Sequence, residues 1–189
     1  MGVLLGFLPF VAFAALSGAL GATGALIAGA VVSAALIVRG RLKGGSWKIL
    51  ELGTFILFCA VAIAMALAGG TLSVIGVRLC VDIGLLGIVL VSLAVGRPFT
   101  LEYAREQVAP EHWGSPVFLR ANIVITSGWA VAFLVMVLAE TALLCVPALP
   151  PAVGVLAIIA ALLGGVVFTR WYAKVGQAAA RQARAELPR

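Results

Sequence analysis

Six apolar runs, separated by short breaks, constrain this chain more than any other feature. A helix needs about 20 apolar residues to cross a bilayer, and about 17 at the least. Lipid offers no hydrogen-bond partner to the backbone, so such runs span a membrane as helices. We predict an all-α polytopic membrane bundle of six transmembrane helices in a single domain, 1–189. The expected spans are 4–20, 24–38, 50–67, 75–95, 121–146 and 152–168.

The basic residues predict how the chain is threaded. Twelve of the 13 Lys and Arg residues lie between the second and third runs, between the fourth and fifth, or after the sixth. The alternate connectors contain none. Basic residues in short loops stay on the cytoplasmic side, so six spans with both termini cytoplasmic account for all twelve. The net charge of +6 is then explained by topology and by anionic membrane lipids, with no role for nucleic acid.

One detail of the threading stays open. The first two runs are short and are separated by a tight break at 21–23, so they form either two spans or a bent hairpin whose tip does not fully cross. Aromatic rings also flank the predicted cytoplasmic ends, where they favour the headgroup layer. These rings belong to Trp47, Tyr103, Trp113, Trp171 and Tyr172.

The segment 97–118 is the longest polar connection. Pro98 breaks the fourth run, Thr100 can cap a short helix, and Pro110 ends it. We expect an interfacial helix on the cytoplasmic leaflet, serving as a structural elbow or docking a partner. The basic tail, 170–189, is expected to extend the sixth helix and then lie along the membrane.

Charged residues inside two runs mark the candidate functional site. Arg78 and Asp82 are one turn apart near the start of the fourth run. Glu140 lies near the finish of the fifth run, which crosses in the opposite direction, so all three lie toward the outer side. By the helical rise all three reach one depth. In the fifth run six residues share one face, with the polar ones at its cytoplasmic end and the acid near its outer end. Their spacings are 4, 3, 4, 3 and 4: Asn122, Thr126, Trp129, Phe133, Met136 and Glu140.

A charge at the bilayer centre costs about 2.5–3.5 kcal/mol, so three of them in one region need a reason. One interpretation is a polar site that binds an ion, a proton or a headgroup. The other is a salt-bridged clamp between the fourth and fifth spans, with Arg78 reaching outward. If all three groups are buried together, their excess negative charge calls for a proton or a cation.

The sequence shows no motif of hydrolytic or redox chemistry. It has no Walker loop, HExxH, GxSxG or CxxC, and a single histidine. We therefore expect no catalytic residue, no metal and no cofactor, and the chain is more easily interpreted as a non-enzyme. Small residues at four-residue spacing in the second run (Ala25, Gly29, Ser33) and the sixth (Ala157, Ala161, Gly165) predict close helix packing, within one chain or in a homodimer.

Several segments resemble the intracellular septation protein A family of bacterial inner-membrane proteins. They are FLPFVAFAAL (7–16), RGRLKGGSWK, GRPFTLEY and HWGSPVFLRANIVITSGWAVAF (112–133). The resemblance implies an association with the cell envelope or division, through protein partners or lipids. It also implies that Trp113, Asn122 and Trp129 are matching positions without assigned roles.

Two functions therefore stand side by side. The first is an envelope-associated membrane protein of the septation type. The alternative is a small transporter or channel, dimeric because six spans are few, that uses Asp82 and Glu140 for an ion, a proton or a small solute.

Overall fold

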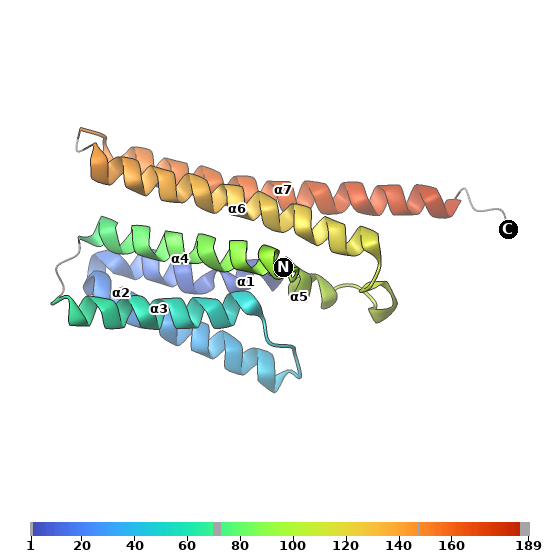
Figure 1. Ribbon diagram of the computed structural model, residues 1–189, viewed down its shortest axis with the longest axis horizontal. Helices are drawn as coiled ribbons and strands as arrows, with labels where there is room; N and C mark the ends of the chain where they lie inside the picture. Colours follow the sequence, from blue (N-terminus) through green and yellow to red (C-terminus); the bar gives the residue numbers. More distant parts are fainter. Residues whose placement is uncertain (1, 70–72, 147, 186–189) are drawn as a thin grey trace.

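The computed structural model describes residues 2–69, 73–146 and 148–185, and within them the chain forms helices and no strand (Figure 1). The last four residues of the predicted basic tail, and parts of the connectors after the third and fifth runs, lie outside these ranges. In chain order the helices are α1 (Gly2–Gly6), α2 (Leu8–Leu42), α3 (Ile49–Leu67), α4 (Val74–Ala94), α5 (Thr100–Arg105), the 3₁₀ turn η1 (Pro110–His112), α6 (Pro116–Cys145) and α7 (Pro151–Ala185).

Five of the described helices, α2, α3, α4, α6 and α7, are long and apolar enough to cross a membrane. The all-helical prediction is confirmed, and the chain has the helices of an integral membrane protein. The predicted first run begins in α1, and the rest of it and the second run fall in α2. α2 is interrupted at Gly21, where φ is 68° and ψ is 177°. That backbone conformation is essentially restricted to glycine.

The side chain of Phe58 shows that α2 folds back on itself at this break. The Phe58 ring lies 5.7 Å from that of Phe13 in the first half of α2. In the second half, a methyl group added at Gly29 would lie 2.8 Å from Phe58. In one straight helix these two positions would be about 24 Å apart. The halves of α2 therefore lie side by side, and Figure 1 shows the chain reversing its direction there.

The helices run roughly parallel or antiparallel and define two ends. Contacts link α2 with α3, α3 with α4, α4 with α6, and α6 with α7. The connector between α2 and α3 lies at the same end as α5 and η1, and we call this the basic end (Figure 1). The break in α2 and the carboxyl-terminal ends of α3 and α6 lie at the opposite end.

The helix boundaries differ from the predicted runs where local capping intervenes. α1 and α2 are separated at Phe7, because Pro9 sits in the first turn of α2 and proline favours helix starts. α6 begins at Pro116, five residues before the predicted span, because the Ser115 hydroxyl accepts the Phe118 amide at 3.2 Å. α7 continues without a break to Ala185, since no proline or turn interrupts it.

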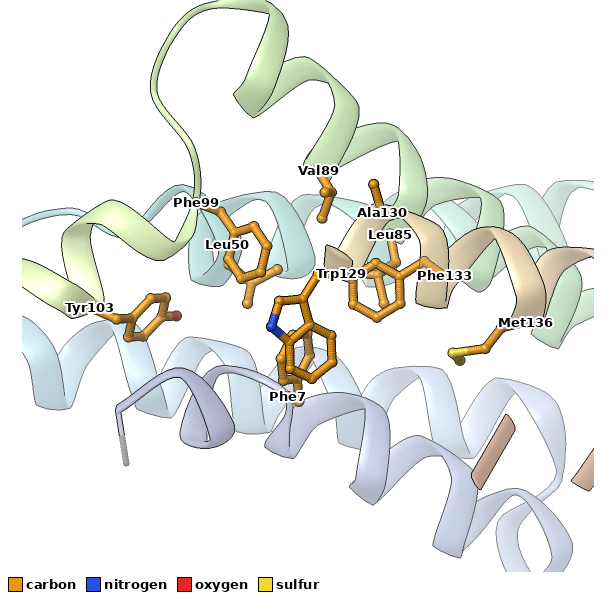
Figure 2. Packing of buried hydrophobic residues seen from close by; sticks show 10 residues of the cluster. All are labelled: Phe7, Leu50, Leu85, Val89, Phe99, Tyr103, Trp129, Ala130, Phe133 and Met136. Atoms are coloured by element: carbon orange, nitrogen blue, oxygen red, sulfur yellow. The ribbon is translucent and has the colours of Figure 1, made fainter. Parts of the chain in front are cut away.

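An aromatic cluster near the basic end joins the N-terminal residues to α6. The Phe7 ring lies 4.7 Å from Trp129 and 5.7 Å from Phe133, and all three side chains are buried. Figure 2 shows Phe7 beneath the Trp129 ring, with Phe99 and Leu50 on one side and Phe133 on the other. Offset and edge contacts of this kind stabilise aromatic pairs beyond the area that they bury.

Both predicted small-residue stripes make contacts inside the chain. Gly29 faces the Phe58 ring, and Gly165 faces Trp129, where an added methyl group would lie 3.0 Å from the indole. Ser33 is buried and donates its hydroxyl to the Glu51 carbonyl oxygen at 2.9 Å. The stripes therefore permit close helix approach within one chain, and the homodimer stays a prediction.

The turn at Gly21 offers a direct test of the fold. Gly21→Ala should lower the stability of the protein by about 1–3 kcal/mol, because a side chain is strained at this backbone conformation. Gly18→Ala is the matched control, since Gly18 is helical and has open space around it. It should be neutral or stabilise the helix by up to about 1 kcal/mol. Thermal unfolding of purified protein in detergent measures both, and equal melting temperatures would contradict the strained turn.

Candidate functional site

The predicted site residues divide into two groups at different heights of the bundle. Asp82 and Glu140 are buried, with Arg78 beside them half-buried. Asn122, Thr126 and Trp129 are also buried, but they lie nearer the basic end and contact other residues. The face of α6 that the spacing defines is thus the buried one. Val131 and Leu138 on its opposite face are 62% and 59% exposed.

We call Asp82, Glu140, Arg78 and Ser17 the acid group. Asp82 lies close enough to Glu140 and Arg78 for both charges to act on it, and Glu140 likewise experiences the charge of Arg78. The Arg78 Nη2 donates to the Ser17 hydroxyl at 3.3 Å, and Ser17 donates to the Ala14 carbonyl oxygen at 2.9 Å. The Arg78 hydrogen bond therefore joins α4 to the first half of α2.

The acid group lacks the ion pair that a salt-bridged clamp would need. Among the described residues, both ion pairs within 4.0 Å are made by Lys48, at the basic end. The Glu140 side chain is only 1% exposed, and its Oε2 atom is buried without a hydrogen-bond partner among the described residues. A buried polar atom without a partner costs about 1–3 kcal/mol, and more if it is charged. This carboxylate oxygen is free to accept a proton or contact a cation.

The polar residues Asn122 and Thr126 of α6 find their partners in Thr100 of α5 and in a backbone carbonyl. Thr100, at the start of α5, donates its hydroxyl to the Asn122 carbonyl oxygen at 3.2 Å and lies 2.8 Å from the Thr126 hydroxyl. The Asn122 amide donates to the Phe118 carbonyl oxygen at 2.9 Å. Thr100 thus ties α5 to α6 and makes no capping hydrogen bond, contrary to our expectation. Trp129 belongs to a separate contact, since its indole donates to the Thr169 hydroxyl of α7 at 3.0 Å.

A second polar network at the basic end was missed by the sequence reasoning. Lys48 lies 2.7 Å from the Glu106 carboxylate and 3.7 Å from that of Glu51. The Tyr103 hydroxyl donates to Glu51 at 3.4 Å, and the Glu102 carboxylate accepts the backbone amide of Ile49 at 3.0 Å. These contacts fasten α5 to the first turn of α3. The available signal was the Lys and Glu content of both segments, but no periodicity links positions more than 50 residues apart.

The expected headgroup position of Tyr103 is wrong. Its side chain is fully buried against Leu50 and Phe99 inside the protein, as Figure 2 shows at one edge of the aromatic cluster. Burial raises the pKa of the Tyr103 hydroxyl far above its ordinary value, and the nearby Glu51 and Glu102 charges add to the effect. The hydroxyl therefore remains a proton donor. Trp47 and Trp171, by contrast, are more than half exposed.

Known proteins give no guide to this geometry. No protein-family model, no curated protein and no solved structure matches the chain. Within the described ranges, no three His, Cys, Asp or Glu side chains come together in a way that could hold a metal ion. The function must therefore be argued from the acid group and the basic end themselves.

The contact between α5 and α6 generates a stability prediction. Thr100→Val keeps the shape of the side chain but leaves Asn122 and Thr126 without their shared partner, and should cost about 1–3 kcal/mol. Thr141→Val is the matched control, because the Thr141 hydroxyl is exposed and only bonds back to Val137 of its own helix. That change should stay within about 0.5 kcal/mol. Thermal unfolding in detergent compares the two, and equal losses would show that Thr100 is not a tie between the helices.

Proposed function

We propose that this protein is a six-span inner-membrane protein with both termini in the cytoplasm. The fold-back of α2 at Gly21 supports two spans in the place of one long helix. The clustering of basic residues at one end supports the orientation, because Lys and Arg in short connectors are retained in the cytoplasm. The short helix α5 then lies at the cytoplasmic interface, where Glu102 and Lys48 anchor it to α3.

The orientation is tested with reporter fusions. A cytoplasm-active reporter should be active after the Arg39–Lys48 connector and at the carboxyl terminus, and inactive when inserted beside Gly21 or Ser73. A reporter that is active only after export should give the reverse pattern. Opposite locations for the Arg39–Lys48 connector and the carboxyl terminus would exclude the six-span arrangement.

Within this topology we propose that the acid group is a proton or monovalent-cation site of a small transporter or channel. The observation that carries the proposal is the buried, unpartnered Oε2 of Glu140 beside Asp82 and Arg78. Intramembrane ionisable residues are costly and are typically retained for ion pathways or proton relays. A fully structural group would be expected to satisfy its acceptors.

The charges suggest which ions the group would handle. Two carboxylates and one guanidinium carry one excess negative charge, which a single proton or monovalent cation balances. Ca²⁺ and Mg²⁺ prefer six or more oxygen ligands, whereas the acid group offers only two carboxyl groups and the Ser17 hydroxyl. Because a six-span chain is small for a transporter, we expect two copies to associate.

Proton flux into proteoliposomes tests this function. With a trapped pH dye and an imposed potassium diffusion potential, the wild-type protein should acidify the lumen faster than protein-free liposomes do. Glu140→Gln and Asp82→Asn should each lower the rate at least about tenfold, because they remove the titrating oxygen and keep the side-chain shape. With external potassium kept low in both cases, a sodium salt in place of an impermeant-cation salt outside the vesicles separates proton flux from sodium-dependent flux.

The matched control is Glu111→Gln, which removes an exposed carboxylate in η1 at the basic end. It should leave the flux unchanged. Wild-type rates equal to those of empty liposomes in both salts, or full activity of both acid variants, would rule out an ion pathway through this group.

The second candidate is the envelope-associated role that the resemblance to the septation protein A family implies. The observation that favours it is the meeting of Phe7 and Trp129, from two of the resembling segments, in one buried cluster. In that case the shared residues support a scaffold that acts through partners or lipids. A deletion strain with an altered cell length, restored equally by wild type and Glu140→Gln, would favour the envelope role over ion transport.

A further inference from the structure

A polar cavity at the basic end is separate from the acid group. It has a volume of about 140 Å³ and is lined by Arg97, Pro98, Leu101, Glu102 and Arg105. Four or five water molecules, at roughly 30 Å³ each, fill such a space. The cavity therefore has room for a phosphate group and is too small for an acyl chain.

Arg105 is held in place and yet lacks a partner. Its guanidinium lies 5.4 Å from the centre of the Trp113 ring. Trp113 is fixed in turn, because its indole donates to the Val108 carbonyl oxygen at 2.9 Å. The Nε atom of Arg105 is buried with no hydrogen-bond partner among the described residues. A pre-oriented guanidinium with an unused donor is suited to an oxyanion.

Glu102, the acid in the cavity, is already engaged. Its Oε2 accepts the Ile49 amide, and no ion pair within 4.0 Å joins it to Arg97 or Arg105 in the described part of the chain. Burial raises the pKa of the Glu102 carboxyl, while the Ile49 hydrogen bond and the arginines act in the opposite direction. Two arginines against one carboxylate leave the cavity with a net positive charge.

We propose that this cavity binds a phosphate oxyanion, held between Arg97 and Arg105. The phosphate comes from an anionic phospholipid headgroup or from free phosphate in solution. Arg105 supplies the oriented donor on α5, and Arg97 supplies the second charge from the end of α4. Glu102 positions α5 through Ile49 and does not contact the anion. The site makes no use of Asp82 or Glu140, so it stands whether or not those residues carry ions.

The chain offers a matched control in Arg41. Its guanidinium also lies over an aromatic ring at the basic end, 4.9 Å from the centre of Trp47. However, Arg41 donates to the Gly45 carbonyl oxygen at 3.3 Å and lines no part of the cavity.

A general attraction of basic residues to anionic lipid is worth about 1 kcal/mol per residue, or roughly fivefold in affinity. A charged hydrogen bond to phosphate is worth about 1.5–3 kcal/mol, or at least about tenfold.

The test titrates full-length protein in neutral detergent with phosphatidylglycerol, and separately with phosphatidylcholine, and counts bound lipid by native mass spectrometry. Arg97→Gln and Arg105→Gln should each weaken phosphatidylglycerol binding at least about tenfold. Arg41→Gln should weaken it by no more than about fivefold. Glu102→Gln should strengthen it, because it removes the negative charge and keeps an acceptor for the Ile49 amide.

Competition with inorganic phosphate separates the two sources. If phosphate displaces the lipid and its own binding depends on both arginines, the ligand is free phosphate. If it does not compete, the ligand is the lipid headgroup. Equal losses for Arg41→Gln and Arg105→Gln, or no gain for Glu102→Gln, would overturn the site. Should Arg105→Gln fail to fold, the exposed Arg97 and the Glu102 variant still decide the question.

Discussion

The constraint on which this structure depends is that hydrocarbon offers no hydrogen-bond partner to a polar group. Polar side chains of the long helices must therefore turn inward and find partners there. Ser33 finds the Glu51 carbonyl oxygen, and Thr126 finds Thr100. Against this background the few unpartnered atoms stand out. In the described long helices they are Thr54 Oγ1 and Glu140 Oε2, and the Glu140 oxygen costs more than the Thr54 hydroxyl when its carboxyl is charged.

Much of the fold followed from periodicity and charge in the sequence. Spacings near 3.6 residues identified the buried face of α6, from Asn122 to Glu140, and the glycine at position 21 marked the break in α2. Both are local features, set by residues within one helix or one turn. The basic residues predicted which connectors share an end, because their placement reflects how each loop meets the membrane surface.

What the sequence could not predict depends on contacts between distant elements. Tyr103 was expected at the headgroups because it flanks a predicted cytoplasmic end. However, α5 packs against α1 and α6 and hydrogen-bonds to the start of α3, so the ring is enclosed. Lys48 and Glu106 meet because Glu102 binds the start of α3. Ser17 belongs to the acid group because the first half of α2 lies against α4, where Arg78 donates to the Ser17 hydroxyl. Each of these pairs depends on how helices pack, which no repeat in the sequence encodes.

The separation between the two polar regions has a mechanistic consequence. Asn122 and Glu140 are 18 residues apart on α6, or about 27 Å along the helix. At that distance mutational effects without shared partners add nearly independently. A headgroup or phosphate bound near Arg105 would therefore act on the acid group mainly through α5, α3 and α4 as packed bodies. Glu102 bonds the first residue of α3, and Arg97 lies shortly after the end of α4. An anion between the arginines would therefore stabilise the ends of these two helices. The ionic chemistry of Asp82 and Glu140 would then depend on the residues around those two acids.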